Sequence, residues 1–275
     1  MGRALGRMLR QRGWRIAAVT ARTPARAAAA VRAIGAGRTQ SSITAEALRA
    51  DVVLICTPDA AVAPVAAHLA RLAGRGSLRG KVVLHTSGAL SSSALAPLAR
   101  RGASTGSMHP MQTFGRRSAP RLDGVIFGLE GDAKAVRLAA RIARSLGGVP
   151  VRIPERDKAA YHCAGGFAAQ HVLAVMEAGI QILLRARFPR RQAFRALDNL
   201  ARQTLENLGA HGPRAAWTGP VARGDFATVV RHVQVLQRYP REFRRAYAEL
   251  TRLAVLLAAP RPGRLLRRLA GVLKN

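Results

Sequence analysis

Short apolar runs alternate with helical segments over the first 153 residues, and this alternation constrains the fold more than any other feature. Residues 51–57 and 82–84 are apolar runs without helical spacing, as in strands that are buried on both faces. Residues 61–72 between them have helical spacing, and further strands are expected at residues 14–20, 103–107, 124–129 and 149–153. The alternation predicts a doubly wound, parallel α/β sheet.

No strand pattern remains after Pro154. Residues 155–185 indicate one long helix with an acidic first turn, which the helix dipole favours. More helices are expected at residues 190–208, 225–238 and 240–258, and an Arg-rich terminal helix at 262–275. We therefore predict two domains, residues 1–153 and 154–275, the second of them all-helical.

The charge of the chain is extreme, at +31, with 41 Arg and 4 Lys. The Arg residues are spread along the chain, and few aromatic side chains are available to stack on bases. This spread favours coding bias in a GC-rich genome over a specific nucleic-acid interface. A nucleic-acid binder would instead gather its Arg side chains on one basic face.

Location and redox state follow from what the sequence contains. No apolar run reaches the roughly 18 residues of a membrane span, and no signal peptide is recognised. Cys56 and Cys163 lie in apolar segments and are expected to be buried free thiols. These features predict a cytoplasmic protein.

The first element of the chain is a helix, residues 3–12, which Gly13 ends. In the dinucleotide-binding fingerprint of Rossmann folds, a strand and a G-x-G-x-x-G turn precede such a helix. Gly2 would then be the third glycine, with roughly a dozen residues missing upstream. The strands on either side of the absent first strand are expected to face an empty slot.

The end of the second Rossmann strand bears on cofactor choice. Enzymes that use NAD usually carry an acidic residue there, which binds the ribose hydroxyls. This chain has Thr20, Arg22 and Thr23 instead. Arg22 could bind the 2′-phosphate of NADP, so NADP is the predicted cofactor.

Two polar clusters, each with a histidine, follow strands. His85, Thr86, Ser87 and Gly88 come after residues 82–84, and His109 comes after residues 103–107. Ligands bind outside the carboxyl ends of strands in open α/β sheets, so both clusters should meet in one crevice. Histidine exchanges protons near neutral pH. The alternative is that each histidine is an ordinary loop residue.

Five motifs in this order carry a resemblance to a known family: residues 52–59 (VVLICTPD), 85–89 (HTSGA), 107–114 (SMHPMQTF), 161–162 (YH) and 218–225 (TGPVARGD). The chain resembles bacterial proteins that join a Rossmann-like NADP-binding domain to a helical domain, DUF2520. These are relatives of F420-dependent NADP oxidoreductases, pyrroline-carboxylate reductases and ketopantoate reductases. The resemblance implies a 6-phosphogluconate-dehydrogenase-like architecture, a homodimer formed by the helical domain, and redox chemistry with a nicotinamide cofactor.

The resemblance also implies roles for single residues. His109 or His162 would donate the proton, and Lys158 is a third candidate, although a lysine at a helix start is usually solvated. The family often has Asn where this chain has Gln170, and a turn capped by Asp225 would also explain residues 218–225. No metal site is expected. The cofactor would contact Gly2, Thr20, Arg22, Thr57, Pro58, Asp59, Thr86, Ser87 and Gly88, and the substrate would contact Gln112, Tyr161, Gln170 and Arg223.

Two hypotheses about function follow. The first is an NADP-dependent oxidoreductase that acts on a small carbonyl compound, such as the 2-oxo acid ketopantoate, or on an imine. The second is a non-catalytic Rossmann-type binding protein or sensor, inactive because the glycine-rich turn is missing. The retained His and Ser clusters favour the first, and the missing turn favours the second.

Overall fold

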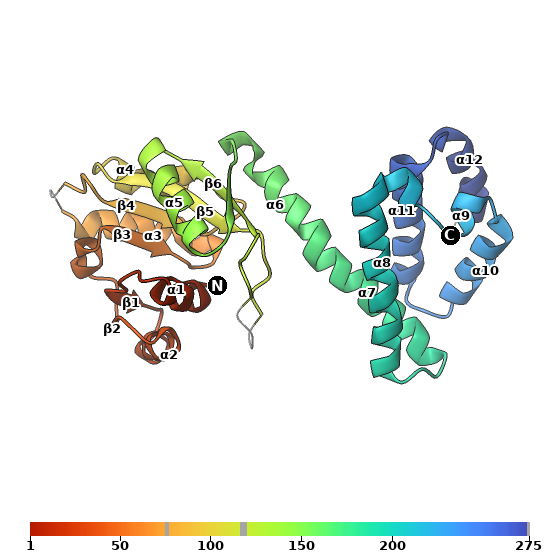
Figure 1. Ribbon diagram of the computed structural model, residues 1–275, viewed down its shortest axis with the longest axis horizontal. Coiled ribbons are helices and arrows are strands. Elements are labelled where there is room, and N and C mark those ends of the chain that lie inside the picture. Colours follow the sequence, from red (N-terminus) through yellow and green to blue (C-terminus); the bar gives the residue numbers. More distant parts are fainter. Residues whose placement is uncertain (75–76, 116–119, 274–275) are drawn as a thin grey trace. The chain divides into compact units, whose positions relative to one another are not determined.

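The computed structural model describes residues 1–74, 77–115 and 120–273. Its packing divides the chain into two units, Met1–Ala169 and Gln170–Asn275 (Figure 1). The first unit is α/β and the second is helical, as the sequence predicts. The division falls later than the boundary expected at Pro154, so helix α6 (Lys158–Gly166) packs with the first unit.

The main sheet of the first unit has five strands. Its order is β3 (Val52–Ile55), β4 (Val82–His85), β5 (Ser104–Pro110), β6 (Ile126–Gly131) and β7 (Val149–Arg152). Neighbouring strands are parallel except β5 and β6, which are antiparallel. The sheet is therefore mainly parallel, as predicted, and departs from the prediction at this one pair. The described part of the connection between them contains no helix, and a parallel return needs such a crossover.

A second, smaller sheet pairs β1 (Ala18–Thr20) with β2 (Arg38–Gln40), in parallel, through helix α2 (Pro24–Ile34). In the described chain, β1 pairs only with β2 and β3 pairs only with β4. The sheet is thus in two pieces, and each piece has a strand edge without a ladder partner. The two strands with such an edge, β1 and β3, are those that were expected to flank the absent first strand.

The strand β1 is shorter than the expected residues 14–20. Trp14 lies outside β1, and its indole Nε1 atom donates to Ser145 Oγ of helix α5 (Ala133–Ser145) at 3.0 Å. The guanidinium of Arg141 lies 5.5 Å from the centre of the same ring. Trp14 therefore anchors the end of helix α1 (Gly2–Gln11) to α5.

Helices cover both faces of the main sheet. Side chains alternate along β4, so that Val82 and Leu84 join one apolar cluster while Val83 joins the other. The first cluster includes residues of α1 and α5, and the second includes residues of α3 (Asp59–Leu72), η2 (Ser92–Leu95) and α4 (Ala96–Ala99). This three-layer packing is typical of doubly wound α/β folds.

The second unit consists of helices, as predicted. They are α7 (Val172–Arg185), α8 (Arg190–Ala216), α9 (Pro220–Arg223), α10 (Phe226–Leu236), α11 (Arg241–Ala258) and α12 (Pro262–Val272). A small core forms around Val229, Val255 and Leu269. Helix α8 breaks at Gly212, whose φ of 75° lies in the left-handed region before Pro213.

One helical stretch of the described chain, Glu155–Arg185, is long and apolar enough to cross a membrane by length and composition. It includes η3 (Glu155–Asp157), α6, the π-helical turn η4 (Phe167–His171) and α7. Its most apolar 18-residue window has a mean hydropathy of 1.5, so by average hydropathy this is a membrane-length stretch that the sequence analysis did not expect. A single such helix is weak evidence for a membrane span, because core and interface helices pass the same test.

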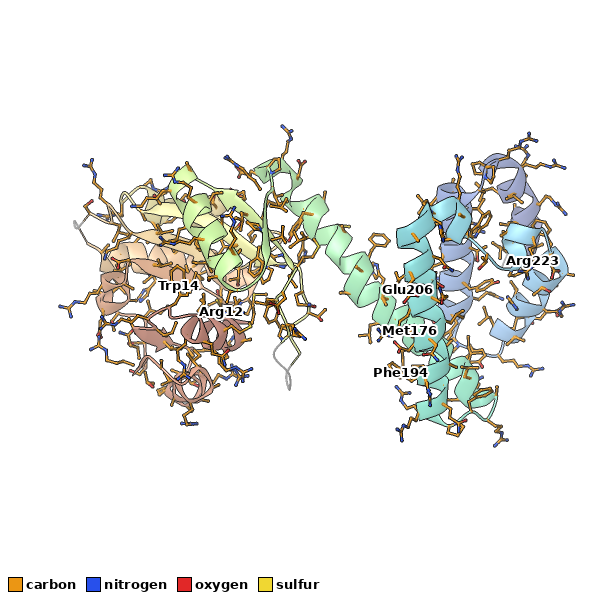
Figure 2. All side chains as sticks on the ribbon, viewed as in Figure 1. Arg12, Trp14, Met176, Phe194, Glu206 and Arg223 are labelled. Atoms are coloured by element: carbon orange, nitrogen blue, oxygen red, sulfur yellow. The ribbon has the colours of Figure 1, made fainter. Side chains whose placement is uncertain are left out.

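Two further expectations concern cysteine and arginine. Cys163 is exposed and Cys56 is half-buried, so the prediction of two buried thiols was wrong for Cys163. Both thiols are free. Nitrogen-tipped side chains project from many sides of both units in Figure 2. This spread is the one expected from coding bias rather than from a single basic face.

Candidate active site

The two polar clusters of the sequence meet at Gly88, in the turn after β4. A Cβ atom added to Gly88 would lie 2.5 Å from His162 Cδ2 and 2.9 Å from His109 Nε2. The centres of the two imidazole rings are 5.8 Å apart, at an interplanar angle of 72°. Gly88 is therefore required so that a ring from β5 and a ring from α6 can flank the turn. The predicted convergence of His109 and Gly88 is confirmed.

Tyr161 orients the imidazole of His109. The Tyr161 hydroxyl donates to the backbone oxygen of His109 at 3.2 Å, and His109 Nδ1 lies 3.2 Å from the same hydroxyl. Because the hydroxyl has only one proton, Nδ1 must donate to it, which leaves Nε2 as an acceptor beside Gly88. A Cβ on Gly128 would lie 2.6 Å from Tyr161 Cζ, so this glycine makes room for the ring.

His109 is neutral at physiological pH. Burial lowers its pKa to about 4, and the charges of His162 and Lys158 act in the same direction, whereas Asp59 opposes them. A neutral imidazole has no spare proton to give, but its Nε2 lone pair can accept a hydrogen bond. His109 is thus better suited to hold a substrate than to protonate it.

Lys158 is buried at the start of α6, with 2% of its surface exposed. Its Nζ atom donates to Ser107 Oγ at 2.8 Å and to Ser87 O at 3.2 Å. Burial lowers the pKa of Lys158, and the charges of Glu130 and Asp59 oppose this shift. The expectation of a solvated lysine was wrong, because α6 begins against the ends of β4 and β5.

Glu130 on β6 is a functional candidate that the sequence motifs do not include. It is 5% exposed, and its carboxylate accepts hydrogen bonds from Ser92 N at 2.7 Å, Ser92 Oγ at 2.6 Å and Ser107 Oγ at 3.3 Å. The signal was present in the sequence, since an acidic residue in a buried strand is rare unless it has partners. Glu130 stands directly after the apolar residue Leu129.

His85 shapes the turn and does not line the site. Its Nε2 atom donates to Ser91 O at 3.0 Å, and its Nδ1 atom accepts from Ser87 N at 3.2 Å. Burial is the main cause that lowers the pKa of His85, so the ring is neutral. Ser87 Oγ accepts from Ala89 N and Leu90 N, at 3.2 and 3.0 Å. The hydroxyl of Thr86 pairs with the Cys56 thiol.

The predicted cofactor residues lie at the carboxyl ends of β1, β3 and β4. A Cβ on Gly2 would lie 3.0 Å from the Cβ of Cys56, which places the start of α1 beside the end of β3. Within the part of the chain that the structure describes, the buried hydroxyl of Thr57, directly after β3, has no hydrogen-bond partner. Pro58 and Asp59 are exposed at the start of α3. A helix start and an orphan hydroxyl at a strand end suit a phosphate-bearing cofactor.

The end of β1 differs in part from the prediction. Arg22 is exposed there and is available to an anion. Thr20 Oγ1 donates to Gln40 Oε1 at 3.1 Å, so its hydroxyl is already committed. The Gln40 amide in turn donates to Glu46 at 2.9 Å, and Arg38 pairs with the same carboxylate.

The remaining predicted substrate residues are Gln112, Gln170 and Arg223. Gln112 is exposed after β5, and its side-chain oxygen accepts from Thr113 N at 2.8 Å. Gln170 and Arg223 are exposed residues of the second unit, and their proposed contacts stay predictions. Asp225 caps α10 by accepting from Thr228 N at 3.0 Å, as the simpler explanation of its motif predicted.

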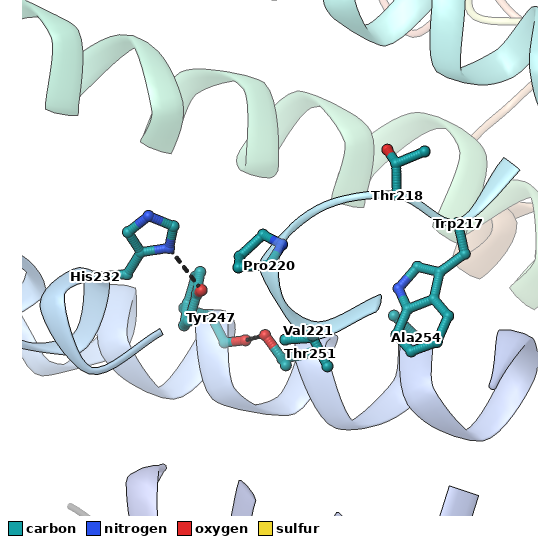
Figure 3. Close-up of a pocket in the computed structure, with 8 residues that line it drawn as sticks. All are labelled: Trp217, Thr218, Pro220, Val221, His232, Tyr247, Thr251 and Ala254. Carbon is teal, nitrogen blue, oxygen red and sulfur yellow. Dashed lines mark hydrogen bonds between the residues drawn. The ribbon is translucent and has the colours of Figure 1, made fainter. Parts of the chain in front are cut away.

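A separate cavity of about 270 Å³ lies in the second unit (Figure 3). Thr218 and Pro220 of the residue 218–225 motif line it, and His232 Nδ1 lies 2.9 Å from the Tyr247 hydroxyl. The cavity lining has no Lys, Arg, Asp or Glu. Over the described residues, no group of three or more His, Cys, Asp or Glu could hold a metal ion.

Comparisons with known proteins agree with this architecture. The fold and the cluster at its sheet edge define a Rossmann-type α/β protein with a helical C-terminal domain. Residues 1–110 match the Rossmann-like domain, and residues 125–254 match DUF2520, a domain of unknown function. The chain therefore matches models of both domains that its motifs indicate. No curated protein matches it.

Solved structures share the fold at low sequence identity. A Bacteroides fragilis protein, provisionally named an NADP oxidoreductase, has a TM-score of 0.75 at 20% identity, over 92% of this chain and 93% of its own. A Thermotoga maritima protein has a TM-score of 0.61 at 24% identity, over 98% and 95%. An imine reductase from Pseudomonas sp. has a TM-score of 0.66 at 18% identity, over 97% and 96%.

Proposed function

We propose that the protein is an NADP-dependent oxidoreductase that reduces a small carbonyl or imine compound by hydride transfer. The observation that carries the proposal is the cluster of Lys158, His109 and His162 around Gly88, at the carboxyl end of a Rossmann-like sheet. A reductive aminase from Aspergillus terreus, in complex with NADPH, shares the fold with a TM-score of 0.63 at 16% identity. This likeness supports the class of reaction and the choice of cofactor.

Residues at the ends of β1 and β3 and at the start of α1 would hold NADP. The Thr57 hydroxyl and the start of α1 at Gly2 would face its phosphates, and Arg22 would bind the 2′-phosphate. When bound, the reduced cofactor supplies the hydride. The unpaired edges of β1 and β3 support the further proposal that an upstream strand inserts between them and completes this site.

The protein supplies the proton and the orientation. Lys158 would give a proton to the substrate oxygen or nitrogen as the hydride reaches the adjacent carbon. Its side chain would then be a neutral amine. The neutral His109 would accept a hydrogen bond at Nε2 and so orient the substrate beside Gly88. His162 lies on the other side of Gly88, where it is exposed to solvent.

A 2-oxo acid such as ketopantoate is the first substrate to test. Arg223 is exposed, and a guanidinium can bind a carboxylate through two parallel hydrogen bonds. A cyclic imine is the second class to test, since His109 Nε2 can accept a hydrogen bond from a protonated imine.

Loss of NADPH absorbance in the presence of these substrates tests the proposal. The proposal predicts substrate-dependent oxidation of NADPH that falls by roughly 10²- to 10⁴-fold in Lys158→Met. Lys134→Met is the matched control, because within the described residues the exposed Lys134 ammonium donates one hydrogen bond, to the backbone oxygen of Gly80. Equal rates in both variants would contradict the assigned role of Lys158.

The second candidate is a non-catalytic NADP-binding sensor. Within the described residues, the edges of β1 and β3 lack ladder partners, and this is the observation that favours it. A sensor would bind NADPH and turn over neither class of substrate, whereas the proposed reductase would do both.

We also propose that the protein is a cytoplasmic homodimer. Large apolar side chains stand exposed on α7 and α8: Val172, Leu173, Val175, Phe194, Leu200, Leu205 and Leu208. Figure 2 labels Phe194 among the projecting side chains of α8. Exposed apolar patches of this extent usually mark an interface. A second copy of the chain is the partner that the family resemblance implies.

A further inference from the structure

A chain of buried hydrogen bonds links Lys158 to a carboxylate that lies outside the cluster around Gly88. Lys158 Nζ donates to Ser107 Oγ at 2.8 Å, and Ser107 Oγ donates to Glu130 Oε2 at 3.3 Å. Ser107 is fully buried, and the two charged residues are 2% and 5% exposed. The three side chains come from α6, β5 and β6.

The environment of Glu130 makes this link specific. Its other hydrogen bonds come from the neutral groups Ser92 N and Ser92 Oγ. No salt bridge is formed by Glu130 within the described residues, so Lys158 is the cation to which its hydrogen bonds lead. A buried charge without an opposite charge is strongly unfavourable, which favours keeping both groups ionised together.

We propose that Glu130 is a positioning residue that, through the Ser107 hydroxyl, keeps the Lys158 ammonium charged and held against the Ser87–Gly88 turn. The inference rests on the proposed function and adds to it the group that controls the proton donor. Within the described residues, the hydrogen bonds of Glu130 come from Ser92 and Ser107, so Glu130 acts on the turn through Lys158.

Other charged and titratable groups also face Lys158. The carboxylate of Asp59 in α3 raises the pKa of Lys158, as that of Glu130 does. His85 of β4 and His109 of β5 also interact electrostatically with Lys158. Asp59 is exposed, so solvent screens its charge. Replacing Glu130 by Gln therefore removes the main buried negative charge, and the pKa of Lys158 should fall further.

Lysine NMR tests the inference without any turnover. The sequence has four lysines, Lys81, Lys134, Lys158 and Lys274, so protein grown with [ε-¹³C]lysine gives few signals. Comparison with Lys158→Met assigns the signal of Lys158. We expect its titration midpoint to fall by about 1 pH unit or more in Glu130→Gln.

The matched control is Glu155→Gln. Glu155 accepts from Ser91 Oγ at 2.7 Å, so it is an acid with a serine partner that is not linked to Ser107. We expect this variant to leave the midpoint of Lys158 unchanged. If Glu130→Gln does not fold, Ser107→Ala breaks the same link while keeping both charges, and it should also lower the midpoint.

Kinetics add a second readout. If the protein is a reductase, Glu130→Gln should shift the alkaline limb of kcat to lower pH by the same amount as the midpoint, with KM nearly unchanged. An unchanged midpoint in a folded Glu130→Gln or Ser107→Ala variant would overturn the inference, whatever the activity. A shifted midpoint without any NADPH oxidation would support the link and contradict the proposed function.

Discussion

His109 and Tyr161 meet edge to face, with ring centres 5.6 Å apart and His109 Nδ1 3.2 Å from the Tyr161 hydroxyl. Tyr161, 52 positions after His109 in the sequence, thus determines which nitrogen of the His109 imidazole faces Gly88. Tyr161→Phe removes the acceptor of the Nδ1 proton and frees the ring to change tautomer. We expect kcat to fall by roughly 10-fold and the free energy of unfolding to fall by only about 1 kcal/mol. Steady-state kinetics and urea unfolding of the two proteins check this, and an unchanged kcat would contradict the orienting role.

Gly88→Ala should disrupt the site through a steric clash. The new Cβ would lie 2.5 Å from one imidazole and 2.9 Å from the other, so both rings must move. We expect kcat/KM to fall roughly 10²-fold or more, because small misplacements of reacting groups are costly. Gly165→Ala is the control, since its Cβ would meet nothing within 4 Å, and it should keep full activity. Equal activity of the two variants would show that the cluster is not the active site.

The stability of the protein should depend on pH through His109. Its pKa is about 4 in the folded state and near 6.5 when unfolded, so the unfolded state takes up the proton first as the pH falls. The neutral His109 makes its full contribution to the free energy of unfolding above pH 6.5. This contribution falls by at most about 3 kcal/mol as the pH falls from 6.5 to 4. His109→Gln should lose less stability over that range in urea unfolding. Parallel losses in both proteins would contradict the shifted pKa.

Asp132 should stabilise the first unit through two elements at once. Its carboxylate accepts from Lys134 N and Ala135 N at 3.0 Å each, at the start of α5, and from Thr105 N of β5 at 2.6 Å. Asp132→Ala should lower the free energy of unfolding by about 2 kcal/mol. Asp51→Ala, at a side chain that is 97% exposed, should change it by less than about 0.5 kcal/mol. Chemical denaturation measures the free energy of unfolding of both variants. Equal losses in Asp132→Ala and Asp51→Ala would contradict the capping role of Asp132.

The proposed dimer makes a prediction about α8. Leu205→Glu places a charge on the exposed apolar face and should weaken self-association roughly 10²-fold. Val149→Glu changes an equally apolar, exposed residue of β7 in the first unit and should leave association unchanged. Sedimentation velocity over a range of concentrations measures both. A wild-type protein that sediments as a monomer would contradict the proposed homodimer.

Much of the fold could be predicted because its local signals agree with its packing. The apolar run of β4, the Thr23 and Asp132 caps, and Gly13 after α1 each act over a few residues. Strand β2 was missed because its residues, Arg38 to Gln40, are polar and show no apolar alternation. The antiparallel direction of β6 was missed because it depends on the path of the preceding connection.

The site was predicted in part for the same reason. Motifs at strand ends located Gly88 and His109, which the sheet brings together. The burial of Lys158 and its link to Glu130 could not be predicted, because they arise where α6 packs on strands distant in the sequence. An acidic residue beside Leu129 was the one local sign of that network.

Fluorescence titration with NADPH tests the central claim most directly. It should be carried out on this chain and on a form extended upstream to the next in-frame start. The account predicts binding that is much tighter in the extended form, because a strand between β1 and β3 would complete the phosphate-binding end of the sheet. Absence of binding in both forms would contradict the assignment as an NADP-dependent oxidoreductase.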